Sequence, residues 1–135
     1  MSSIDTEFLV QFDDVQKEQK FISLMKLIER KKYKEMESVI DSNYESNQFI
    51  HEDDVTFEVF EKKGGIVQGS IESGTLSFEE EDFKAFIKVS GARYALVSHY
   101  YSQIGESTEY ALKNGKRYGK KKLLDEISKI KGSAN

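Results

Sequence analysis

Histidine is the side chain best suited to proton transfer near neutral pH, and this chain has two, His51 and His99. The alternating pattern predicts that His99 lies in a strand, on the same face as Tyr101 and near Glu106 or Glu109 across a turn. A histidine oriented by a carboxylate can act as a general base. Nothing nearby reads as a nucleophile or an electrophilic site, so the alternative is a hydrogen-bonded structural or interface histidine.

Other catalytic chemistry finds little support in the sequence. There is no phosphate-binding glycine loop, no dinucleotide-binding fingerprint and no serine nucleophile elbow. The absence of cysteine excludes thiol catalysis and disulfides. The string His51-Glu52-Asp53-Asp54 is rich in metal ligands, but neighbouring residues of a loop rarely converge on one ion. We therefore expect no cofactor, no metal site and no enzymatic activity.

Acidic side chains form the first candidate binding surface. Residues 1–82 hold 20 acidic and 9 basic side chains, whereas residues 83–135 hold 4 acidic and 11 basic ones. The densest acidic run spans residues 79–82, at the start of a predicted helix. Acids stabilise a helix N-terminus, but four in a row exceed that need and repel one another. The run is therefore either a solvated helix cap or a surface that contacts a partner. The predicted partner-binding residues are Asp53, Asp54, Glu72, Glu79, Glu80, Glu81 and Asp82.

Basic side chains gather at residues 113–122, which contain Lys113, Lys116, Arg117 and Lys120–Lys122. Such a patch beside aromatic rings is typical of nucleic-acid binding, so RNA or another cellular protein are its candidate ligands. The sequence pI near 5.3 makes nucleic acid the less favoured partner. Of tyrosines 94, 100, 101, 110 and 118, some are expected to lie in the core and some to cap the sheet face; the alternative is an exposed aromatic face for a protein partner.

These side chains must be positioned by one folded unit. A length of 135 residues predicts a single domain over residues 1–135, with residues 1–6 and 132–135 frayed. No apolar run approaches the roughly 20 residues of a membrane span, and the N-terminus lacks the apolar stretch of a signal peptide. We expect a cytoplasmic protein without a membrane partner.

Helical spacing of apolar residues predicts the helices. Residues 14–41 form either one long helix or two that meet near residue 31, and the length favours a break. Asp13 and Asp14 offer an N-cap to the first helix. A capping box at Ser77 precedes a helix over residues 78–90, which Gly91 would end. The last helix is predicted from Leu123, Leu124, Ile127 and Ile130, and ends at Gly132.

Alternating apolar residues and turn signals predict the strands. Hairpin turns are expected at Gly64-Gly65 and Asn114-Gly115, and Gly69 indicates a bulge or close backbone packing. Residues 92–118 carry apolar groups on both faces and are expected to form the centre of the sheet. The predicted fold is α+β, with a mostly antiparallel sheet of five to six strands and helices largely on one face. The predicted order is β-α(α)-β-β-α-β-β-(β)-α.

In size, charge and architecture the whole chain resembles the immunity proteins of bacterial toxin–immunity pairs, such as those of contact-dependent growth inhibition. Those are small cytoplasmic proteins, often acidic, that block a cognate toxin, commonly a nuclease. The resemblance implies a non-enzymatic, stoichiometric inhibitor whose carboxylates mimic the phosphates that a basic nuclease binds. The alternatives are a regulatory module that binds RNA or a cellular protein through residues 113–122, and a small enzyme that uses His99.

Overall fold

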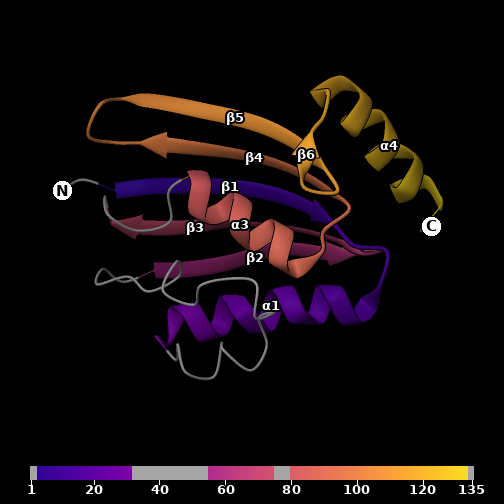
Figure 1. Cartoon of the computed structure of the whole chain (residues 1–135), viewed down its shortest axis with the longest axis horizontal. Helices are drawn as coiled ribbons and strands as arrows, with labels where there is room; N and C mark the ends of the chain where they lie inside the picture. Colours follow the sequence, from indigo (N-terminus) through magenta and orange to yellow (C-terminus); the bar gives the residue numbers. More distant parts are fainter. Residues whose placement is uncertain (1–2, 32–54, 75–79, 134–135) are drawn as a thin grey trace.

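A computed structural model of the chain describes residues 3–31, 55–74 and 80–133. Its strands form one antiparallel sheet in the order β2-β3-β1-β4-β5-β6 (Figure 1), which confirms the predicted α+β fold. The strands are β1 (Ser3–Gln11), β2 (Val55–Lys63), β3 (Ile66–Gly74), β4 (Tyr94–Tyr101), β5 (Glu106–Lys113) and β6 (Lys116–Arg117). The helices among these residues are α1 (Val15–Glu29), α3 (Glu80–Ser90) and α4 (Lys120–Ser133).

The two middle strands of the sheet are β1, which pairs with β3 and β4, and β4 itself. The expectation that residues 92–118 form the centre is therefore confirmed for β4 and wrong for β5 and β6, which lie toward one edge. The expected fraying of residues 1–6 is also wrong from Ser3 onward, because Ile4 and Thr6 are each 1% exposed. Pairing on both sides satisfies the backbone groups of β1, and this long-range effect outweighs the polar composition of its first residues.

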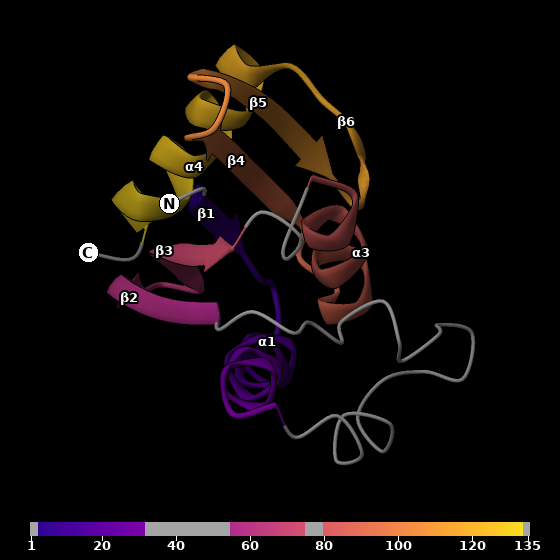
Figure 2. The ribbon, with the colours of Figure 1, turned by 90° about the vertical axis from the view of Figure 1, so that its left-hand side faces the viewer.

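The helices lie on both sides of the sheet. α1 and α3 cover one face (Figure 2), and α4 lies on the opposite face. Two of the three described helices thus share a face, in agreement with the prediction of helices largely on one face. The larger core lies under α1 and α3 and is rich in aromatic rings. There the ring of Phe21 lies 4.9–5.6 Å, centroid to centroid, from the rings of Phe8, Phe12 and Phe86.

The predicted helix ends are largely confirmed. The Asp14 carboxylate accepts a hydrogen bond from the Gln16 backbone N–H at 2.8 Å. α1 ends at Glu29, and Lys31 adopts a positive φ of 58°. The first helix therefore ends near residue 31, as expected. Gly91 follows α3 with a φ of 76°, and its N–H donates to the Ile87 carbonyl at 3.1 Å. The capping-box residue Ser77 lies outside the described residues.

The two hairpin turns are also confirmed, since Gly64, Gly65, Asn114 and Gly115 all have positive φ. α4 continues through Gly132 to Ser133, so the expected helix end at Gly132 is wrong, as is the expected fraying of residues 132 and 133. Glycine can adopt helical φ at a cost of about 1 kcal/mol relative to alanine, which leaves the helix free to continue by another residue.

Gly69 on β3 lies opposite Val59, where the register of β2 shifts between Val59 and Glu61. The bulge is therefore on the partner strand, and Gly69 itself is closely packed, which confirms the predicted close approach. A Cβ atom at this position would overlap the Glu58 carbonyl oxygen and come within 2.9 Å of Phe8 Cζ.

Gly69→Ala is consequently expected to lower the free energy of unfolding by about 1–3 kcal/mol, because backbone or core must shift to admit the methyl group. Urea denaturation measures the change. Gly132→Ala is the matched control, since nothing lies within 4 Å of the added Cβ; it should stabilise α4 by up to about 1 kcal/mol. Equal stability of the two variants would contradict the close packing at Gly69.

Candidate functional site

One face of the sheet is covered only in part by the described helices. Successive residues of a strand point to opposite faces, and on β1 Phe8 points toward α1 and α3, whereas Leu9 lies in the cluster that contains Leu123 of α4. α4 lies mainly against β4 and β5 on this second face (Figure 2), and its buried residues also pack in a cluster with Leu9 of β1 and Ile66 of β3. We call the remainder the open face, which includes Asp5, Glu7, Leu9, Glu58, Phe60, Gln68, Ser70, Glu72, Leu96, Ser98, Tyr100 and Glu109.

Carboxylates from four strands meet on the open face. Glu7 of β1 lies directly opposite Ser70 of β3 and Ser98 of β4. The same row continues to Glu58 of β2 beyond Ser70, and to Glu109 of β5 beyond Ser98. The next row holds Asp5 opposite Glu72. The side chains of Asp5, Glu7, Glu58, Glu72 and Glu109 are all exposed, so the open face presents a broad negative surface.

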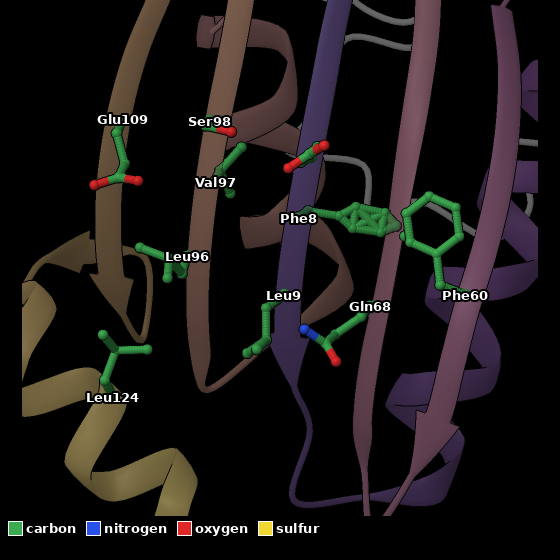
Figure 3. A pocket seen from close by; sticks show the side chains of 11 residues that line it. Phe8, Leu9, Phe60, Gln68, Leu96, Val97, Ser98, Glu109 and Leu124 are labelled. Atoms are coloured by element: carbon green, nitrogen blue, oxygen red, sulfur yellow. The ribbon is translucent and has the colours of Figure 1, made fainter.

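A groove of about 360 Å³ runs across the open face between β2 and α4. Leu9, Leu96 and Gln68 lie along its floor (Figure 3). Its two sides carry Phe60 of β2, 60% exposed, and Leu124 of α4, 40% exposed. Because apolar side chains lie beside carboxylates here, the groove combines the two components of a protein-binding surface, an apolar centre and a polar rim.

A basic side chain of the same molecule already reaches the groove. Lys120, in the first turn of α4, places its Nζ 2.8 Å from Glu109 Oε1. The two side chains are 54% and 47% exposed, and such solvent-exposed pairs contribute little to stability. The pair therefore matters mainly for the local charge, because it partly neutralises the α4 side of the groove.

The residues predicted to bind a partner do not all lie on the open face. Glu72 does. Glu80, Glu81 and Asp82 begin α3, which packs on the opposite side of the sheet (Figure 2). Asp53, Asp54 and Glu79 lie outside the described residues.

Sequence reasoning missed the other carboxylates of the open face, Asp5, Glu7, Glu58 and Glu109. The sequence pattern that could have indicated them is the alternation of acidic with buried residues along one strand. Glu7, for example, lies between the buried residues Thr6 and Phe8. That alternation shows which side chains share a face of one strand, but not which strands are neighbours.

His99 is fully buried, with 0% of its surface exposed. Its Nδ1 lies 2.7 Å from Thr6 Oγ1, and its Nε2 lies 2.8 Å from the Tyr110 hydroxyl. It shares a face with Tyr101 as predicted, with ring centroids 6.4 Å apart, whereas Glu109 points to the other face. A buried ring with both nitrogens hydrogen-bonded has the character of a structural histidine, and this position gives no support to a general-base role.

The basic patch at residues 113–122 spans the end of β5, β6 and the first turn of α4. The Lys113 ammonium lies 5.6 Å from the ring centroid of Tyr94 and 5.3 Å from that of Tyr118. As expected, the tyrosines divide between core and surface, since Tyr94 is 1% exposed and Tyr100 is 46% exposed. Arg117 and Lys120–Lys122 line a hollow at the start of α4, together with Tyr118 and Asp125.

Comparison with known proteins gives no family for the chain: no family model, no curated protein and no solved structure matches it. Among the described residues, no group of three or more histidine, aspartate or glutamate side chains could hold a metal ion. No helix within residues 3–31, 55–74 and 80–133 is long and apolar enough to cross a membrane.

Proposed function

We propose that this protein is a non-enzymatic binding protein whose open face holds the basic surface of a protein partner. The observation that carries the proposal is the convergence of exposed carboxylates from four strands on one sheet face. The uncovered parts of these strands, which are spaced about 4.8 Å apart, place the carboxylates side by side on one surface next to α4.

The partner that fits the resemblance to immunity proteins is a basic toxin domain. A nuclease binds a row of phosphates, and rows of carboxylates on the open face offer a comparable arrangement of negative charge. Complementary charge of this kind speeds association and selects the partner more than it raises affinity. A protein that acts in this way needs no catalytic residue, so the buried position of His99 is compatible with the proposal.

The basic patch gives a second candidate function, the binding of RNA or of a cellular protein. It is favoured by the exposed side chains of Arg117 and Lys120–Lys122, which line the hollow at the start of α4, and by the neighbouring exposed Lys116. The net charge of −4 opposes it, because the chain as a whole repels a polyanion. The open face therefore remains the preferred surface.

The test is the association of the purified chain with a toxin domain encoded directly upstream of its gene. The double variant Glu7→Lys with Glu72→Lys should associate at least about tenfold more slowly in low salt, because it removes the attraction that steers the partner. The difference should shrink as salt screens the charges. Stopped-flow fluorescence at several salt concentrations measures both effects.

The matched control is Glu106→Lys with Asp125→Lys, which makes the same change in net charge at exposed positions outside the open face. If this control slows association as much as the open-face variant does, total charge governs binding and the proposed surface is wrong. If the toxin domain forms no stoichiometric complex with the unmodified chain, the proposed immunity function is wrong.

A further inference from the structure

We infer that the groove in the open face receives an arginine side chain of the basic partner, with the guanidinium held between Glu7 and Glu109. This inference rests on the proposed function and identifies the anchoring group of the partner. A groove of about 360 Å³ lies at the lower end of the range of about 300–1,000 Å³ found for small-molecule sites, so it has room for one side chain.

The two carboxylates flank the groove at a separation that suits a planar group. Glu7 and Glu109 lie on either side of Ser98 in one cross-strand row, so their backbones are two strand spacings apart, roughly 9.6 Å. Both side chains are long enough to reach inward over Ser98. A guanidinium carries donors on two edges and can bond to both carboxylates at once, whereas an ammonium is a compact point charge.

The apolar lining favours the rest of an arginine side chain. Leu9 and Leu96 on the floor offer contact to the methylene stem (Figure 3). Phe60 is the extra residue at the bulge of β2, and its exposed ring stands at the side of the groove. Bulges commonly direct side chains next to functional sites, and a guanidinium stacks on an aromatic face more readily than an ammonium does.

Lys120 shows that the Glu109 carboxylate is placed to hold a cation, since the two atoms are 2.8 Å apart. In the free protein this lysine occupies part of the carboxylate that the arginine would use. The arginine of the partner must share the Glu109 carboxylate with Lys120 or displace the lysine from it. Lys120 therefore competes with the arginine and weakens its binding. Removal of its ammonium should strengthen the binding of an arginine ligand.

The experiment uses the full chain and two fluorescent peptides of equal length, oligoarginine and oligolysine, followed by fluorescence anisotropy. The unmodified protein should bind oligoarginine several-fold more tightly. Glu7→Gln and Glu109→Gln should each weaken oligoarginine binding about tenfold, which corresponds to about 1.4 kcal/mol. Phe60→Ala should reduce the preference for arginine over lysine.

Lys120→Ala should tighten the binding of oligoarginine more than Lys121→Ala does. The second variant is the control, because it makes an equal change of charge on the same helix turn.

Glu72→Gln is the matched control, because it makes the same change of charge on the open face but outside the groove. If it weakens oligoarginine binding as much as Glu7→Gln does, and the peptides bind equally, the arginine site is wrong. The proposed function then still stands on general charge, because its own test is association with the toxin domain. Failure of the unmodified chain to bind oligoarginine would likewise overturn the arginine site.

Discussion

Phe21→Ala is expected to lower the free energy of unfolding by about 3–5 kcal/mol, the largest effect of any single change considered for this chain. Phe21 is 0% exposed. Its ring contacts the rings of Phe8 in β1, of Phe12 directly after β1, and of Phe86 in α3. The substitution leaves a cavity where α1, α3 and the sheet meet, and rings held on three sides cannot collapse fully into it.

Phe60→Ala makes the same chemical change at a position that is 60% exposed. Its stability should stay within about 0.5 kcal/mol of that of the unmodified protein, because little apolar surface is released there. Urea denaturation of both variants, with the slope compared as well as the midpoint, measures the difference. A similar loss in the two variants would show that Phe21 is not the hub of the core. The stable Phe60→Ala variant also allows its effect on arginine binding to be read without a folding defect.

His99→Ala should lower the free energy of unfolding by about 2–4 kcal/mol. The imidazole hydrogen-bonds to the Thr6 and Tyr110 hydroxyls, and its removal leaves two buried hydroxyl groups without this partner and a cavity beside Phe83. Tyr110→Phe, which removes only one hydroxyl, should cost about 1–2 kcal/mol. Thermal unfolding followed by circular dichroism compares the two variants.

The same variant separates the structural role of His99 from a catalytic one. Under conditions where it remains folded, His99→Ala should bind the proposed toxin partner at an unchanged rate, because the ring lies on the sheet face opposite the open face. A variant of unchanged stability that had lost its biological activity would contradict the structural role and revive the enzyme hypothesis.

The local features of the fold follow directly from the sequence. Asp14 caps α1, Gly91 follows α3 with a positive φ, and Asn114-Gly115 forms the turn between β5 and β6. Each depends on atoms within a few residues along the chain, where residue type fixes the accessible φ values and the nearby donors and acceptors. The alternating and helical patterns likewise determined that the chain is an α+β domain.

The tertiary structure alone decided the order of the strands and therefore the candidate site. Glu7, Ser98 and Glu109 form one row only because β1 pairs with β4 and β4 with β5. Strand alternation is the same whichever neighbour a strand has, so the pattern could not place β1 at the centre or predict which face α4 leaves open. Those choices depend on the total burial and pairing of segments that lie nearly a hundred residues apart in the chain. The sequence by itself determined the charge and the elements, and long-range packing determined which charges meet.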